Sequence, residues 1–333
     1  MREPTMADIA NHLGVSRQLV SIVLRDAPGA SDDTRVRVRR AAQTLGYRPH
    51  LGARSLRGAQ NRMVGVAFAP GHGAEIAVVE SLYPAAAAQG YDVVLSALTR
   101  TRTTRQAVDQ LLGYRCAAVI VLGSQLSGPH MRALARHARV PLVAVARDDR
   151  GPGYDTIRSA GDQGTAALVG HLVGLGHEQL TYVHCPAMPM AGLRLDGFLR
   201  AASAAGCETD LLEVRSRDHT EEAGAMAGRR LIRRGELPTA VLTGNDEQAV
   251  GLLHVLARAG VRVPQDVSVT GYGDIRLASL SAVDLTTVRE DPDQMAVAAV
   301  GAVVRRLETP SARPGLRVVR PRLLVRGSTA PPP

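Results

Sequence analysis

The fold is decided near the N-terminus by residues 5–24, which read TMADIANHLGVSRQLVSIVL. Thr5 stands three residues before Asp8, the spacing at which a hydroxyl and a carboxylate satisfy the free amides of a first helical turn. Gly14 is a favourable residue to end that helix, and Ser16 is a favourable N-cap for a second one. The stretch therefore predicts two short helices joined by a tight turn, a helix-turn-helix.

A third helix is predicted to begin after Ser31 and to end at Gly46. Asp32 and Asp33 place negative charge in its first turn, where it complements the helix dipole. The apolar side of each helix is short, so all three are expected to share one small core. The residues predicted for that core are Ile9, Ala10, Leu13, Leu19, Val20, Val23, Leu24, Val38, Ala41, Ala42 and Leu45.

Positive charge is concentrated in the same part of the chain. The first 60 residues hold ten Arg and five acidic residues, which is more than half of the net charge of +9. Lys is absent and all 40 basic residues are Arg, so the total alone says little about function. Charge gathered at one end is typical of a protein that binds a polyanion, since neutralised phosphates release condensed counterions.

The exposed side of the second predicted helix carries Arg17 and Gln18 near its start. These side chains suit the edges of guanine and adenine in the major groove of DNA. A small three-helix bundle can also be an interaction module for another protein. Charge and position together favour DNA binding.

Short motifs in this region resemble the LacI/GalR family of regulators. They are TMADIA at 5–10, GVS at 14–16, VS at 20–21, VL at 23–24, Ser31, Thr34-Arg35, LGYRP at 45–49 and ARSL at 53–56. The resemblance implies that the second helix reads the major groove, and that residues 50–57 form a hinge helix. Paired hinge helices of the family enter the minor groove and wedge a leucine, here Leu56, into a central base step.

By the same resemblance, Arg17 and Gln18 are expected to contact bases, whereas Ser16, Ser21 and Thr34 position phosphates. The full set of residues expected at the DNA is Thr5, Ser16, Arg17, Gln18, Ser21, Ile22, Arg25, Ser31, Thr34, Tyr47, His50, Ala53, Arg54, Leu56 and Arg57.

Two of these residues depart from the family pattern. Ile22 stands where Arg is usual and Arg25 stands where Asn is usual, so the half-site is expected to differ from the family's commonest one. The hinge helix is expected to form only on DNA, because a helix of about eight residues that contains Gly52 does not persist alone in water. A plain flexible linker is the alternative for this segment.

From Arg62 onward, short apolar runs alternate with helical stretches, which predicts parallel sheets covered by helices on both faces. The expected strands are 63–69, 91–97, 117–122, 141–146, 180–184, 239–243 and 267–270. The expected helices include 76–89, 161–175, 191–205, 221–234 and 247–259. About eleven strands are too many for one simple sheet, so two similar lobes with a ligand between their strand ends are predicted.

Landmarks of this region also resemble the family's effector domain, which is related to periplasmic sugar-binding proteins. They lie at 176–177, 194–198, 243–246, 261–269 and 285–288. The resemblance implies that Arg194 and Asn245 bind the effector. Their ordinary alternatives are a surface ion pair and a helix N-cap.

The effector site departs from the family in other places. Gly273 stands where the family has an effector-contacting Asp, which leaves the neighbouring Asp274 as a candidate. His72 and Glu75 follow the first strand where the family has aromatic residues, and are candidates for a different ligand or members of a solvated loop. With two Phe, seven Tyr and no Trp, the chain offers a sugar ring little to stack on.

The predicted organisation is an all-α helix-turn-helix domain with a hinge helix, followed by an α/β, two-lobed, periplasmic-binding-protein-like domain with parallel sheets. The boundaries are 1–48 for the DNA-binding domain, 49–61 for the hinge and linker, 62–327 for the effector-binding and dimerisation domain, and 328–333 for a disordered tail. Lobe 1 is expected to hold 62–159 and 291–317, and lobe 2 to hold 160–290 and 318–327.

The predicted function is a cytoplasmic, homodimeric transcription regulator, a repressor that binds a palindromic operator and responds to a small polar effector such as a sugar. No C-terminal heptads are visible, which favours a dimer over a tetramer. The alternatives are the same regulator with a degenerate pocket, controlled by a protein partner or unliganded, and a solute-binding protein. The last would need a signal peptide, and neither an apolar leader nor a membrane span is visible.

Catalytic and metal chemistry find little support in the sequence. There is no G-x-S-x-G, P-loop or H-E-x-x-H motif, so an enzyme and a cofactor are not expected. Cys116, Cys185 and Cys207 are widely spaced, which predicts neither a disulfide framework nor a metal site.

Overall fold

The computed structural model describes residues 4–24, 27–47, 61–124, 126–148, 151–216 and 220–333. The chain divides after Asn61 into a small helical unit and a large α/β unit. Within the described ranges, no helix is both long and apolar enough to cross a membrane.

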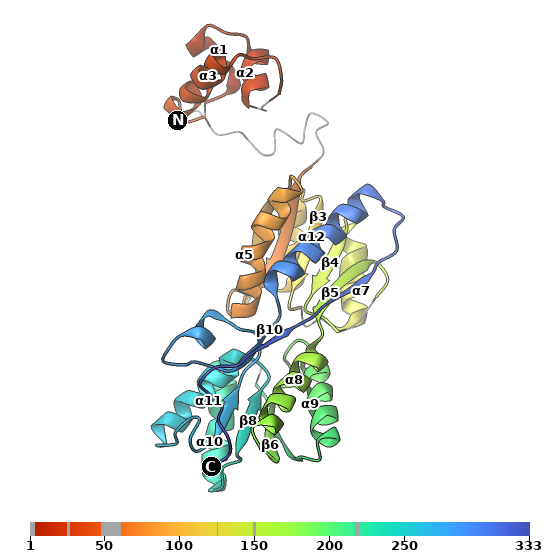
Figure 1. Ribbon diagram of the computed structural model, residues 1–333. Helices are drawn as coiled ribbons and strands as arrows, with labels where there is room; N and C mark the ends of the chain where they lie inside the picture. The colour runs from red at the N-terminus through yellow and green to blue at the C-terminus, as the bar shows by residue number, and fades with distance from the viewer. Residues whose placement is uncertain (1–3, 25–26, 48–60, 125, 149–150, 217–219) are drawn as a thin grey trace. The chain divides into compact units, whose positions relative to one another are not determined.

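The small unit is a bundle of three helices, α1 (Met6–Leu13), α2 (Arg17–Leu24) and α3 (Asp32–Thr44) (Figure 1). Its core is built on Ile9, Val20, Val23 and Val38, each no more than 1% exposed. The helices begin and end where the capping residues of the sequence predict, so the prediction of a helix-turn-helix followed by a third helix is confirmed.

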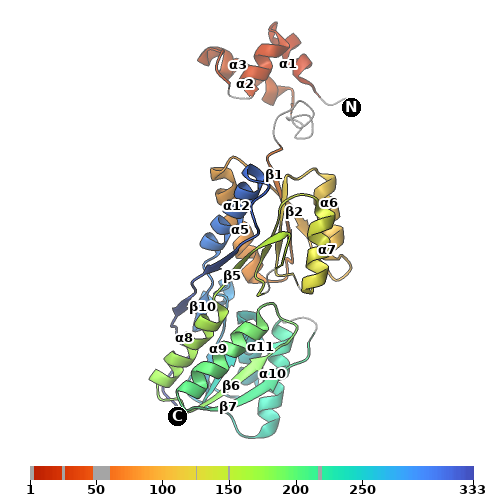
Figure 2. The same ribbon diagram turned by 90° about the vertical axis from the view of Figure 1, so that its right-hand side faces the viewer.

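Lobe 1 of the large unit is a six-stranded parallel sheet in the order β11-β5-β4-β3-β1-β2. The strands are β1 (Met63–Phe68), β2 (Asp92–Ala97), β3 (Ala118–Leu122), β4 (Leu142–Val145), β5 (Tyr154–Ser159) and β11 (Leu316–Val319). Figure 2 shows α5 (Gly73–Ala88) and α12 (Pro292–Glu308) on one face, and α6 (Thr104–Gly113) and α7 (Gly128–Ala138) on the other. Central strands such as β3 are apolar throughout because helices cover both faces.

Lobe 2 repeats this plan with four parallel strands in the order β7-β6-β8-β9. The strands are β6 (Gln179–His184), β7 (Glu208–Glu213), β8 (Ala240–Thr243) and β9 (Ser268–Thr270). One face packs on α8 (Gly161–Gly174) and α9 (Ala191–Ala204), and the other on α10 (Glu221–Arg234) and α11 (Asp246–Arg258). The predicted α/β fold with two parallel sheets is confirmed.

The chain passes between the lobes three times, after β5, after β10 (Thr287–Arg289) and after β11. β10 pairs antiparallel with β12 (Arg322–Leu324), which follows the third crossing. Because Val319 of β11 pairs with Ser159 of β5, lobe 1 extends two residues beyond the predicted boundary at 317.

The tail differs from the disordered segment predicted for 328–333. Ser328 is 3% exposed, and its Oγ donates to the carbonyl of Val269 at 2.6 Å and accepts from the amide of Thr286 at 2.8 Å. The carbonyl of Ala330 accepts from Oγ of Ser268 at 3.1 Å and from the ring of His177 at 2.9 Å. Hydroxyl and backbone groups hold this segment against lobe 2, so no hydrophobic pattern announces it.

Helices α10 and α11 touch through their backbones. A Cβ on Gly224 would lie 1.8 Å from the carbonyl oxygen of Gln248, and one on Gly251 would lie 1.8 Å from that of Glu221. We therefore expect Gly224→Ala to lower the free energy of unfolding by about 1 to 3 kcal/mol, because the helices must separate. Urea unfolding of the full chain measures this change.

Gly170→Ala on α8 is the matched control, since no atom lies within 4 Å of the position of its Cβ. Alanine there should stabilise the protein by about 0.4 to 1 kcal/mol, because it restricts the unfolded chain. Equal changes in the two variants would show that backbone contact between α10 and α11 does not set their spacing.

Candidate DNA interface and interlobe site

The start of each of the first two helices is fixed by its cap. The amide of Thr5 donates to Oδ2 of Asp8 at 2.7 Å, and the amide of Asp8 donates to Oγ1 of Thr5 at 3.4 Å. Ser16 accepts from the amide of Leu19 at 3.1 Å. Gly14 has the left-handed conformation, with φ +65°, which turns the chain between the helices.

Arg17 and Gln18 are exposed on the first turn of α2, while Val20 and Val23 of the same helix are buried. The helix thus holds its core face against the bundle and presents the two polar side chains at the surface. Ile22 is different: it is half-buried, and a side chain on Gly29 would begin 3.8 Å from its Cδ1. It packs beside the loop that joins α2 to α3.

Other residues predicted at the DNA have structural contacts. Ser31 is the N-cap of α3, and its Oγ lies 2.9 Å from Oγ1 of Thr34. Tyr47 is half-buried against the core of the bundle, and Ser21 is half-buried on α2. The remaining residues of the prediction lie outside the described part of the chain: Arg25, His50, Ala53, Arg54, Leu56 and Arg57.

In the large unit, Arg194 is a buried cation, 6% exposed. Its Nη1 donates to the carbonyl of Gly244 at 2.6 Å and its Nη2 to Oε1 of Glu290 at 3.1 Å, and its Cζ lies 3.8 Å from the centre of the Tyr272 ring. Burial acts to lower the pKa of Arg194, but Glu290 and the two nearby tyrosines, Tyr272 and Tyr182, raise it above its usual value. The predicted effector residue is thus already paired within the protein.

Asn245 and Asp274 also have partners. Asn245 is the N-cap of α11, and its Oδ1 accepts from the amide of Gln248 at 2.9 Å. The carboxylate of Asp274 accepts from Arg326 at 2.6 Å and lies 3.8 Å from Nη1 of Arg289. Asp274 therefore ties the segment after β12 to β10.

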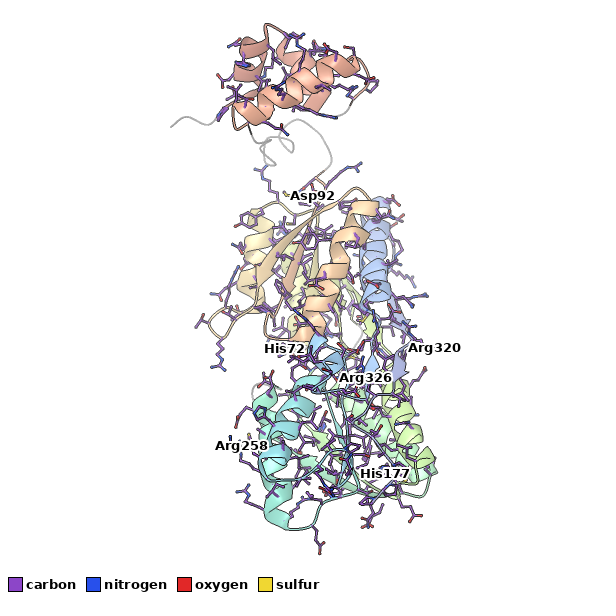
Figure 3. The ribbon with its side chains drawn as sticks, turned by 60° about the vertical axis from the view of Figure 1, so that its left-hand side comes forward. His72, Asp92, His177, Arg258, Arg320 and Arg326 are labelled. Atoms are coloured by element: carbon purple, nitrogen blue, oxygen red, sulfur yellow. The ribbon has the colours of Figure 1, made fainter. Side chains whose placement is uncertain are left out.

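The two lobes are joined directly where α5 and α11 begin. Oε1 of Glu247 accepts from the amide of Gly73 at 2.9 Å, so an acid of lobe 2 caps a helix of lobe 1. Glu75 accepts from the amide of Ala69 at 2.7 Å. Burial raises the pKa of Glu75 to about 7; the bond from Ala69 opposes this rise and the charge of Glu247 adds to it. His72, the N-cap residue of α5, lies where lobe 1 meets lobe 2 (Figure 3).

A hollow of about 320 Å³ lies between the lobes. Its walls follow β3, β4 and β6 and consist of Ser124, Leu126, Ala146, Arg147, Asp148, Pro186, Ala187, Met188, Pro189, Met190, Ala191 and Gly192. Arg147 donates to the carbonyls of Ser124 at 2.8 Å and Leu126 at 2.6 Å, which fixes the loop after β3. The position of the hollow agrees with ligand binding at the carboxyl ends of parallel strands.

The sequence reasoning missed several residues of this region: Arg147, Met188, Glu247, Gln248 and Glu290. Each follows the carboxyl end of a strand, which is the only local signal they carry. None of the five effector candidates lines the hollow, and Arg194 approaches it through Met188.

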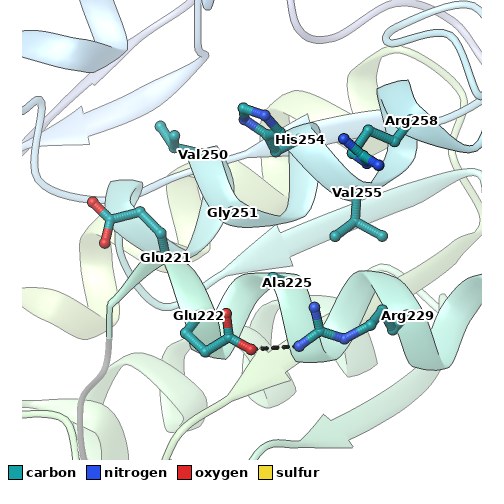
Figure 4. A pocket seen from close by; sticks show the side chains of 9 residues that line it. All are labelled: Glu221, Glu222, Ala225, Arg229, Val250, Gly251, His254, Val255 and Arg258. Carbon is teal, nitrogen blue, oxygen red and sulfur yellow. Dashed lines mark hydrogen bonds and ion pairs between the residues drawn. The ribbon is translucent and has the colours of Figure 1, made fainter.

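A second hollow, of about 460 Å³, lies between α10 and α11 (Figure 4). Glu222 and Arg229 form an ion pair of 2.5 Å across its floor, and His254 and Arg258 stand on the opposite side. Its charges are mixed. Among the described residues, no group of three His, Cys, Asp or Glu side chains is placed to hold a metal ion.

Comparison with known proteins agrees with this arrangement. A family model for bacterial regulatory proteins of the lacI family matches residues 5–50, and one for a periplasmic binding protein-like domain matches residues 169–329. The lactose operon repressor of Escherichia coli (strain K12) is 30% identical over 295 residues, 87% of this chain and 81% of that protein.

Solved structures lead to the same family. The lac repressor dimer bound to operator and the anti-inducer ONPF is 28% identical with a TM-score of 0.82, over 99% of this chain and 100% of that one. A LacI transcriptional regulator from Rhodococcus species is 34% identical with a TM-score of 0.76, over 81% of this chain and 99% of that one. The chain therefore belongs to the LacI family of bacterial regulatory proteins, and it is a DNA-binding transcriptional regulator.

Proposed function

We propose that this protein is a cytoplasmic repressor that binds a palindromic operator as a homodimer and releases or grips it in response to a small polar effector. It acts by binding and not by catalysis. The observation that carries the proposal is the capped helix α2, which presents Arg17 and Gln18 at the surface of a basic bundle. The similar lac repressor is described as a dimer bound to operator and to an anti-inducer.

Base recognition by α2 follows from the chemistry of its first turn. Arginine can bond both O6 and N7 of guanine, and glutamine can bond N6 and N7 of adenine, each worth about 1 to 3 kcal/mol of discrimination. Ile22 cannot make such bonds, and its half-buried side chain offers at most an apolar contact with a thymine methyl group. The half-site should therefore be read mainly through Arg17 and Gln18.

Dimerisation is supported by exposed apolar side chains on neighbouring elements of the large unit. Tyr83 on α5, Val297 on α12, and Leu277 and Leu280 at the short helix η1 (Arg276–Ser279) are all exposed. α5 packs beside α12, and η1 follows Ile275, which lies against the start of α5. A two-fold axis through this face would bury all four side chains twice.

Selection of binding sites from random duplex DNA tests the DNA-reading proposal. We expect a palindrome of two half-sites, and we expect Arg17→Ala to weaken binding to it by about 1 to 3 kcal/mol while binding to bulk DNA changes little. Arg40→Ala on α3 is the control: it removes an equal charge from the surface of the same bundle and should leave the selected sequence unchanged. A selected site with a single half-site, or none, would contradict the dimeric repressor.

The effector is proposed to occupy the hollow between the lobes, because two-lobed α/β proteins bind ligands between facing strand ends. A second candidate function is the same regulator with a degenerate pocket. It is favoured by the contacts of Arg194, Asn245 and Asp274, whose polar groups are bound inside the protein.

Thermal unfolding with uncharged sugars and polyols separates these two candidates. A ligand at 100 times its Kd should stabilise the protein by about 2.7 kcal/mol and raise the Tm. By linkage, that ligand must also change the affinity for the selected operator by the same factor that operator DNA changes the ligand's affinity. Operator binding that is intact, together with a Tm that no compound moves, would favour the degenerate pocket.

A further inference from the structure

Met188, in the loop after β6, separates the interlobe hollow from a buried polar floor in lobe 2. Its Sδ lies 3.9 Å from Nη1 of Arg194, and a Cβ on Gly244 would lie 2.7 Å from its methyl carbon. Met188 is 6% exposed and lines the hollow, whereas Arg194 and Gln248 do not line it. The thioether therefore stands between the hollow and these two side chains.

Two hydrogen-bond donors of that floor lack acceptors. Nε of Arg194 and Nε2 of Gln248 have no hydrogen-bond partner in the described part of the chain, although the two residues are 6% and 0% exposed. Oε1 of Gln248 accepts from the amide of Gly244 at 3.1 Å, next to Met188. A buried donor without an acceptor costs about 1 to 3 kcal/mol, and a thioether is too weak an acceptor to recover this.

The loop that carries Met188 holds conformational strain. Met190 has φ +64° and ψ 8°, a left-handed conformation that costs a residue with a side chain about 1 kcal/mol. Methionine itself is unbranched and rotates about three side-chain bonds, so it can leave one packing site for another. Turning Met188 outward would thus expose a floor whose donors gain from a new acceptor.

We propose that Met188 is the gate and a specificity-determining residue of the interlobe site. When it turns out of its present place, the hollow extends to Arg194 and Gln248, and a small ligand with two neighbouring hydroxyl or carbonyl oxygens accepts bonds from Nε and Nε2. The ligand is uncharged, because Glu290 already balances Arg194, and it is not held by stacking on Tyr272, whose ring Arg194 covers. The inference rests on the proposed effector function and names the chemistry of that site.

Cys185 reports the gate without any ligand. Its side chain is 0% exposed and packs with Met188 and Ala191 in a small cluster of its own. Opening the gate uncovers the thiol, so we expect N-ethylmaleimide to label Cys185 in the native full-length protein. Peptide mass spectrometry should show that Met188→Ala speeds labelling of Cys185 by about tenfold, the factor expected when roughly 1.4 kcal/mol of cover is removed.

Two comparisons separate gating from loss of stability. Cys116, 3% exposed in the core of lobe 1, should keep its labelling rate in Met188→Ala, and so should the half-buried Cys207. Met226→Ala, which trims a half-buried methionine on α10, should not speed Cys185 alone. An unchanged rate at Cys185, or equal acceleration at Cys185 and Cys116, would overturn the gate.

The ligand chemistry has its own measurement. In protein with methyl-labelled methionine, the NMR signal of Met188, assigned with Met188→Leu, should shift with an uncharged probe among D-ribose, cellobiose and glycerol. It should not shift with D-gluconate or D-glucose 6-phosphate. A shift with an anion alone, or with none of the five, would overturn the proposed ligand class. Neither experiment involves DNA, so failure of the gate and failure of operator binding are seen separately.

Discussion

The ion pair of Arg194 and Glu290 is the interaction on which the large unit depends. Arg194 belongs to α9 of lobe 2, and Glu290 stands where the chain leaves β10 for α12 of lobe 1, so the pair joins a helix to a crossing. Both side chains are shielded from water, and loss of one partner from such a pair leaves a buried charge that costs about 3 to 5 kcal/mol. The link of Glu247 to the amide of Gly73 acts beside it, and the two together set how the lobes meet.

This constraint explains how a sensor can be built on these lobes. Coupling between effector and operator sites is typically worth about 1 to 3 kcal/mol, which is the scale of one or two buried polar contacts. The interlobe region has such contacts in reserve: donors on Arg194 and Gln248 that lack acceptors, and a carboxyl on Glu75 whose pKa burial raises to about 7. A ligand that completes some of them favours one arrangement of the lobes over another.

The local parts of the fold could be predicted from the sequence, and the non-local parts could not. Thr5, Asp8, Gly14 and Ser16 announce their helices because capping is decided within four residues, and apolar strands such as β3 announce themselves by composition. β7 reads ETDLLE, since an edge strand with a solvated face lacks a continuous apolar run. The partners of Arg194 could not be found, because Gly244 and Glu290 are distant in sequence and their spacing carries no pattern.

A double-mutant cycle on Arg194 and Glu290, followed by urea unfolding of the full chain, tests this view most directly. Arg194→Met and Glu290→Gln should each lower the free energy of unfolding, and the double variant should lose less than the two losses together, by at least about 1 kcal/mol. Losses that add to within about 0.5 kcal/mol would show that the pair does not act as a unit, and the lobes would then be held by other contacts.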